Sequence, residues 1–133
     1  MSELNRARAI QWMEDNWNNR REEVINELMH PACVGRIEGG EIKGREEWRQ
    51  VRKELLTAFP DLKMEVEQSV VEGDTVVLRW RVNGTHDGDA MGLKRSGRKF
   101  EAVGSTWMKF ADGKMVWGCD TWNQGALMTS LVA

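Results

Sequence analysis

Apolar positions in the first half of the chain repeat with helical spacing. Near the N-terminus they recur every three or four residues, at Leu4, Ala7, Ile10, Met13 and Trp17. This spacing predicts a first helix, which Asn16, Asn18 and Asn19 are expected to end. Similar stripes predict a short second helix over 24–29 and a third over about 45–58.

From residue 62 onward the apolar period changes to two, which is typical of half-buried strands. The segments with this alternation are 62–71, 75–85, 100–110 and 114–122. Asp112-Gly113 predicts a tight hairpin turn between the last two. A long glycine-punctuated connection precedes the third strand, and residues 123–133 are expected to form a tail.

Helices that precede a run of antiparallel strands predict an α+β fold, with one curved antiparallel sheet wrapped around the N-terminal helices. A chain of 133 residues is long enough to bury a core without disulfide or metal staples. We therefore expect residues 1–133 to form one domain.

The last two predicted strands are apolar on both faces. One face carries Trp107, Trp117 and Cys119, and the other carries Thr106, Met108, Phe110, Val116, Asp120 and Trp122. A sheet that helices cover on one side is normally polar on its other side. The pattern therefore predicts a homodimer that forms through the outer face of the sheet.

Composition narrows the classes of partner. The formal net charge is −2, which gives no general attraction to nucleic acid or to an anionic membrane surface. No segment reaches membrane-spanning length, and the N-terminus lacks the apolar core of a signal peptide. Cys33 and Cys119 form neither a disulfide framework nor a metal-ligand spacing, so a reducing cytoplasm is expected.

One carboxyl group lies in an unusual place for its chemistry. Asp120 is in the middle of the apolar strand 114–122, although aspartate is depleted in strands and its charge is costly to bury. Burial would raise the pKa of this carboxyl, as a general acid/base working near neutral pH requires. The alternative is a structural carboxylate that accepts hydrogen bonds from backbone amides.

Short motifs in a fixed order carry a resemblance to a known family. They are His30-Pro31, Ala58-Phe59-Pro60-Asp61-Leu62, Gly84-Thr85-His86-Asp87-Gly88, Asp112-Gly113-Lys114 and Gln124-Gly125-Ala126-Leu127. With this order and spacing, the chain resembles the SnoaL-like polyketide cyclase (ester cyclase) family. That family has the cone-shaped, cystatin-like fold of the nuclear transport factor two-like superfamily.

The resemblance implies a reaction and a catalytic residue. In polyketide cyclases of this family, an aspartate on the last strand is the acid/base of an aldol ring closure, and Asp120 matches its position. No metal or cofactor is implied. Two positions depart from the better-known cyclases, because Thr106 replaces a histidine and Asn123 replaces a second carboxylate. Neighbouring families isomerise ketosteroids, dehydrate or open epoxides, so the resemblance leaves the reaction open.

Other residues are candidates for a site around Asp120. His86 could be a second acid/base or bind substrate at the pocket mouth, and Asn123 could donate to a developing oxyanion. The candidates for the pocket wall and its rim are Trp12, Trp48, Trp80, Trp122, His30 and Thr106. Each has a structural alternative, which is core packing for a tryptophan and a turn or helix end for a polar residue.

Three hypotheses follow. The first is a small cofactor-free enzyme that performs acid/base chemistry, such as aldol cyclisation, isomerisation or a lyase step, on an apolar carbonyl substrate in an enclosed pocket. The alternative is a non-catalytic protein of the same fold that binds a small hydrophobic ligand. The third is a purely associative role through the apolar sheet face.

Overall fold

The computed structural model describes residues 2–37 and 40–132, and it contains helices and one six-stranded sheet. The helices are α1 (Ser2–Met13), the π-helical segment η1 (Glu14–Asn18), α2 (Glu23–Leu28), α3 (Gly44–Ala58) and α4 (Gln124–Val132). The strands are β1 (Met29–Ile37), β2 (Gly40–Lys43), β3 (Lys63–Glu72), β4 (Thr75–Thr85), β5 (Lys99–Ala111) and β6 (Lys114–Trp122). Within the described ranges, no helix has the length and apolar character needed to cross a membrane.

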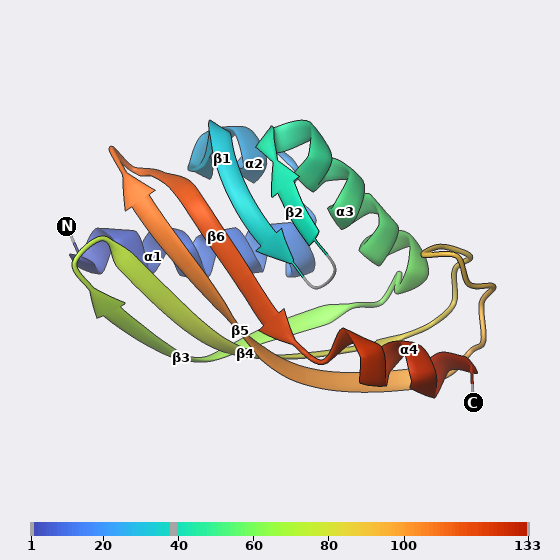
Figure 1. Ribbon diagram of the computed structural model, residues 1–133. Helices are drawn as coiled ribbons and strands as arrows, with labels where there is room; N and C mark the ends of the chain where they lie inside the picture. The colour runs from blue at the N-terminus through green and yellow to red at the C-terminus, as the bar shows by residue number, and fades with distance from the viewer. Residues whose placement is uncertain (1, 38–39, 133) are drawn as a thin grey trace.

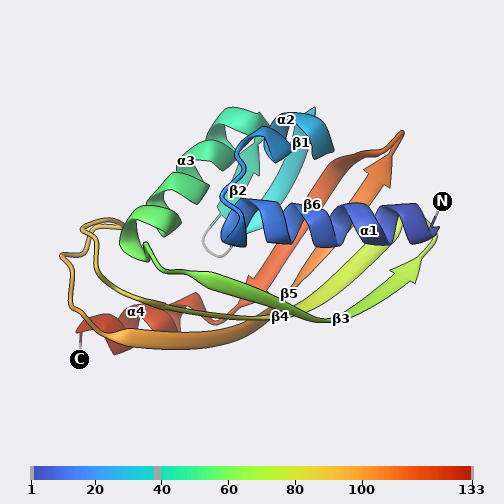
Figure 2. The same cartoon turned by 180° about the vertical axis from the view of Figure 1, so that it is seen from behind.

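The sheet curves around the N-terminal helices. Its strand order is β2-β1-β6-β5-β4-β3. Helices α1 and α3 lie on the same side of it, and α4 extends from the end of β6 (Figures 1 and 2). The predicted α+β class is confirmed. The all-antiparallel prediction fails at one pair, since β1 and β6 are parallel. No hairpin joins these two strands, so no turn constrains their direction.

One further prediction about elements was wrong. The expected tail is helix α4, whose Leu127 and Leu131 are buried four residues apart on one helical face. The first helical stretch ends at the asparagines, as expected, but its last part is π-helical: α1 continues into η1, which ends at Asn18 with Asn19 as its C-cap. Asn16 is completely buried there, and its side-chain amide donates to the carbonyl of Trp12 at 2.8 Å. Asn18 ties the segment to the sheet by donating to the Met64 carbonyl and accepting from the Met64 amide.

The π-helical segment decides which side chains face the sheet. In a regular α-helix, residues five positions apart point in directions that differ by about 140°. The wider turn of η1 takes up the extra residue, so Trp12 and Trp17 are both buried and both border the same internal space.

The pairing of β5 with β6 agrees with most of the predictions of which side chains point toward the helices, but one residue was predicted wrongly. Trp107 is exposed, whereas Thr106, Met108 and Phe110 are buried. Between the pairs Lys109–Trp117 and Phe110–Met115 the register shifts by one residue. This bulge reverses the alternation, so Met115 is buried where Val116 was expected.

Candidate functional site: an apolar cavity lined by Asp120

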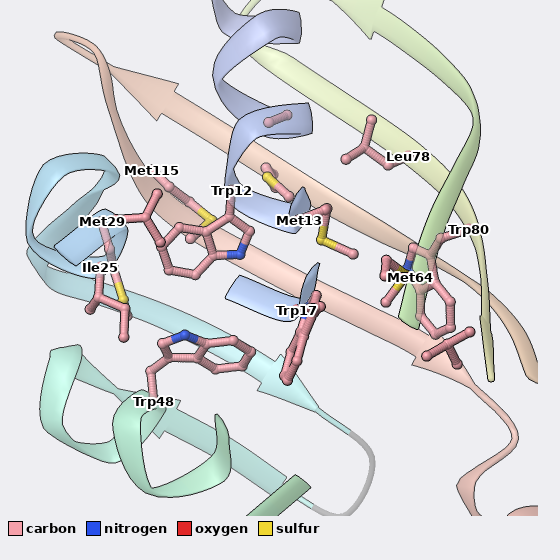
Figure 3. Close-up of a cluster of buried hydrophobic side chains, with 14 of the residues drawn as sticks. Trp12, Met13, Trp17, Ile25, Met29, Trp48, Met64, Leu78, Trp80 and Met115 are labelled. Carbon is pink, nitrogen blue, oxygen red and sulfur yellow. The ribbon is translucent and has the colours of Figure 1, made fainter. Parts of the chain in front are cut away.

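The candidate functional site is a cavity between the helices and the concave face of the sheet. Its volume is about 100 Å³, and most of its lining is apolar. Five of the seven tryptophans border it, namely Trp12, Trp17, Trp48, Trp80 and Trp122. Figure 3 shows Trp12, Trp17 and Trp48 grouped together, with Trp80 and Met64 to their right.

Trp48 is the centre of the helical part of the cavity wall. Its ring lies 5.7 Å from that of Trp12 and 5.8 Å from that of Trp17, measured between centroids. Its indole N–H donates to the side-chain oxygen of Asn16 at 3.4 Å. Aromatic pairs at these separations are favourable beyond the area they bury, so the three rings form one connected wall.

The sheet part of the wall depends on a glycine. Gly104 pairs with Trp80 on one side and with Trp122 on the other. A Cβ atom at this position would lie 2.7 Å from the Trp80 ring and 2.8 Å from the Trp122 Cβ. Because glycine has no side chain here, the two indoles approach each other edge to face, with centroids 6.3 Å apart.

Among the residues that the structure describes, Asp120 brings the one carboxyl group into this lining. It pairs with Thr106 across β5 and β6, and the Thr106 hydroxyl donates to Asp120 Oδ1 at 2.7 Å. Trp80 Nε1 in turn donates to the Thr106 oxygen at 2.9 Å. Three side chains from adjacent strands therefore form a hydrogen-bonded chain that ends at the carboxyl group.

Burial raises the pKa of Asp120 to about 6, because the surrounding protein disfavours the charged form. The hydrogen bond from Thr106 lowers the pKa and offsets part of this shift. No charged side chain of the described residues contributes to it. At pH 7 the carboxyl is about nine-tenths ionised and can still take up a proton, which suits a general base.

His86 lies outside the cavity lining. Its side chain is only 1% exposed; its Nδ1 is 2.9 Å from the Ser96 hydroxyl, and its ring packs on Phe59 at 5.7 Å. Its backbone carbonyl also accepts from the amides of Ser96 and Gly97. The histidine therefore organises the connection between β4 and β5, and the structure does not bring it to Asp120.

The other two predicted polar candidates are also away from the cavity lining. His30 is exposed, and its Nδ1 accepts from the backbone amide of Ala32. Asn123 is exposed and caps α4, because its side-chain oxygen accepts from the amide of Ala126 at 2.9 Å. The remaining candidates line the cavity, namely Thr106, Trp12, Trp48, Trp80 and Trp122.

Sequence reasoning missed Trp17 and the sulfur-containing part of the lining. The methionines that border the cavity are Met13, Met29, Met64 and Met115. Trp17 is the last residue of the predicted apolar stripe. It lies five residues after Trp12, and in a regular α-helix two residues with this spacing point in different directions, so the sequence did not place both at one site. The richness in methionine, eight residues in all, was the available signal.

Cys33 also lines the cavity. Burial raises the pKa of its thiol to about 11, so the reactive thiolate is scarce near neutral pH. In the described ranges, no group of three or more His, Cys, Asp or Glu side chains is arranged to hold a metal ion. Asp120 is thus the lining residue best suited to proton transfer.

This architecture, a curved sheet around helices, is the nuclear transport factor two-like fold. A nuclear transport factor two-like protein of unknown function from Exiguobacterium sp. 255-15 shares this fold with a TM-score of 0.71 at 23% identity. That match covers 86% of this chain and 97% of the other.

Sequence comparison defines the family more narrowly. The chain belongs to the SnoaL-like polyketide cyclase family, whose model matches residues 7–131. A candidate SnoaL-like polyketide cyclase from Jannaschia sp. CCS1 is 26% identical over 100% of this chain and 94% of the other, with a TM-score of 0.93. AclR, a candidate hydroxylase from Streptomyces galilaeus, is 26% identical over 99% and 98%, with a TM-score of 0.87. No curated protein matches the chain in sequence.

Proposed function

We propose that this protein is a small enzyme that transfers a proton next to the carbonyl group of an apolar substrate, with Asp120 as its general acid/base. The observation that carries the proposal is one carboxyl group, with its pKa raised to about 6, in the lining of an otherwise largely apolar cavity. The tryptophan wall would hold the substrate through its apolar and aromatic surfaces.

The reaction needs no group beyond the carboxylate for its proton balance. Asp120 takes a proton from the carbon beside the carbonyl, the C–H electron pair forms a C=C bond, and the carbonyl π pair moves to oxygen. If the substrate is a β,γ-unsaturated ketone, return of the proton to the γ carbon, with the oxygen electron pair re-forming the carbonyl, completes an isomerisation. Alternatively, the enolate carbon attacks a second carbonyl of the same molecule, and Asp120 protonates the new alkoxide, which completes an aldol cyclisation.

The cavity volume limits the substrate. At about 100 Å³ it is smaller than the 300–1,000 Å³ of ordinary ligand sites, and closer to cavities of about 150 Å³ that take up benzene. We therefore propose a compact carbonyl compound of about one ring. The apolar lining favours substrates without charged groups.

Deuterium exchange tests this proposal without knowledge of the natural substrate. Cyclohexanone and phenylacetone, which are one-ring apolar ketones with exchangeable protons beside the carbonyl, are incubated with the protein in heavy water and followed by proton NMR. We expect exchange faster than in buffer, rising with pH through a midpoint near 6, the pKa of Asp120. Exchange at the buffer rate throughout, or a midpoint near 4, would contradict the proposed base.

A second candidate function is binding without turnover. It is favoured by the position of His86, which does not contribute a second acid/base to the cavity lining. This candidate requires that the same ketones bind, as measured by calorimetry, while their protons exchange at the buffer rate. Exchange that depends on Asp120 would eliminate it.

We also propose that two copies associate through the outer face of the sheet. In the single chain, Trp107 is 47% exposed, Val103 47% and Val70 54%. Val70, Val77 and Trp107 are aligned across β3, β4 and β5. Exposed aromatic and aliphatic side chains in one row are typical of an interface.

Sedimentation measures this association directly. We expect the wild type and Trp107→Phe to be dimers at micromolar concentration and Trp107→Glu to be a monomer, because a buried interface charge without a partner is costly. Far-ultraviolet circular dichroism checks that the glutamate variant is folded. A monomeric wild type, or a Trp107→Glu variant that remains dimeric, would contradict the proposal.

A further inference from the structure

We propose that Trp80 and Thr106 are positioning residues that assign different tasks to the two oxygens of Asp120. The indole N–H of Trp80 and the hydroxyl of Thr106 would hold Oδ1 as a permanent hydrogen-bond acceptor. Oδ2 would then be the only oxygen that exchanges a proton with a ligand in the cavity. The inference rests on the proposed function of Asp120 as a general base and names the atom that performs it.

The direction of the hydrogen bonds follows from the chemistry of the three groups. A tryptophan indole nitrogen can only donate, so the bond from Trp80 occupies a lone pair of the Thr106 oxygen. A threonine hydroxyl has one hydrogen, and Asp120 Oδ1 at 2.7 Å is its one acceptor in the described part of the chain. Thr106 therefore donates to Oδ1, and no other acceptor among the described residues competes for its hydroxyl hydrogen.

Oδ2 is in a different environment. The described residues provide no hydrogen-bond partner for it. Among these residues, Arg52 Nε is the one side-chain nitrogen or oxygen that is both fully buried and without a partner. Because Oδ2 also has no partner, it is not fully buried and retains accessible surface. Since Asp120 lines the cavity, that surface would face the space that a ligand occupies.

The difference between the partners of Oδ1 and Oδ2 decides which oxygen takes up the proton. A proton on Oδ1 would occupy one of its lone pairs and make it the hydroxyl oxygen of the acid, which accepts hydrogen bonds much less well, so the bond from Thr106 would be weakened. A proton on Oδ2 leaves both hydrogen bonds of the chain intact. Proton uptake and return would therefore occur at one oxygen, on one side of the bound substrate. Thr106 itself does not titrate in this range and takes no part as an acid or base.

Carbon NMR titration of the Asp120 carboxyl in matched variants tests the inference without any substrate. Thr106→Val keeps the shape but removes the hydroxyl, so we expect the pKa of Asp120 to rise by about one unit or more. Thr106→Ser restores a donor and should return the pKa to the wild-type value. Equal pKa values in the wild type and Thr106→Val would overturn the role of Thr106.

Two tryptophan variants test the role of Trp80. In Trp80→Phe the Thr106 hydroxyl is no longer held by a donor and can also accept from the neutral acid, so the pKa of Asp120 should rise. Trp122→Phe is the matched control, because it removes a cavity indole that is not part of the hydrogen-bonded chain. It should leave the pKa closer to the wild-type value than Trp80→Phe does. Equal shifts in the two variants would overturn the role of Trp80.

The outcomes separate this inference from the proposed function. A wild-type pKa near the ordinary value of about 3.9 would contradict the general base itself. A raised wild-type pKa that does not respond to Thr106→Val would contradict only the positioning chain. Where Thr106→Val does shift the pKa, the pH midpoint of ketone deuterium exchange should shift upward with it.

Discussion

Asp120→Asn is expected to abolish ketone proton exchange and, at pH 8, to make the protein more stable. The loss follows from the proposed role, since a positioned general base contributes about 10²–10⁴ in rate. Asparagine has nearly the same shape as aspartate and its carbonyl oxygen can still accept from Thr106, whose hydroxyl lies 2.7 Å from Oδ1. The rate loss would therefore reflect the missing base and not a disrupted fold.

The gain in stability follows from the direction of the pKa shift. Burial raises the pKa of Asp120 in the folded chain from 3.8 to about 6, so the folded state holds this proton more tightly than the unfolded state. The resulting stabilisation is complete below about pH 4 and is lost as the pH rises through about 6. Two pKa units correspond to about 3 kcal/mol, which is the upper bound for the gain at pH 8.

Urea unfolding at pH 4 and pH 8 measures this effect. The difference between Asp120→Asn and the wild type should be small at pH 4 and should favour the variant at pH 8. Asp112→Asn is a matched control in the exposed hairpin turn, where Asp112 has a φ of 51° that asparagine also tolerates. An Asp120→Asn variant that is less stable than the wild type at pH 8 would contradict a raised pKa of the Asp120 carboxyl in the folded chain.

Trp48→Ala is expected to lower the free energy of unfolding by about 3–5 kcal/mol, the range for removing a large aromatic side chain from a core. Trp48 is buried between Trp12 and Trp17. Its loss also removes the indole donor to the completely buried Asn16. The variant should therefore lose both packing and a buried hydrogen bond.

Trp48→Phe separates the two contributions. It keeps a ring between Trp12 and Trp17 but has no N–H, so we expect a smaller loss of about 1–3 kcal/mol. Thermal and urea unfolding of both variants give the comparison. A Trp48→Ala variant within about 0.5 kcal/mol of the wild type, the range of ordinary surface substitutions, would contradict a structural wall around the cavity.

Local sequence signals predicted the regular elements well. The predicted bounds 75–85 and 114–122 agree with β4 and β6, because apolar alternation and glycine turns act over a few residues. The errors came from features that depend on distant parts of the chain. Neither the parallel β1–β6 pair nor the bulge that buries Met115 has a local pattern of its own. The π-helical segment is tied to the sheet by Asn18, whose side chain bonds to the backbone of Met64, 46 residues away along the chain.

The same distinction applies to the site. Asp120 was predictable, because one carboxylate in an apolar strand conflicts with strand preferences. His86 was a candidate only by residue type and neighbouring glycines, and its position in a loop did not reveal that its ring packs on Phe59. The bond from Trp80 to Thr106 depends on the β4–β5 register, which pairs Trp80 with Gly104 and Leu78 with Thr106. Because that register is set by the pairing of two strands that are distant in the sequence, no local pattern revealed it.

The central claim is that Asp120 is a cavity carboxyl whose pKa is raised by burial. Carbon NMR titration of the wild-type protein tests it most directly, with Asp120→Asn identifying the resonance. The account predicts a carboxyl that titrates at about 6 and is missing in the variant. A resonance that titrates at or below about 3.9, the ordinary value for aspartate, would contradict the account, because Asp120 would then be a solvated or fully hydrogen-bonded structural carboxylate.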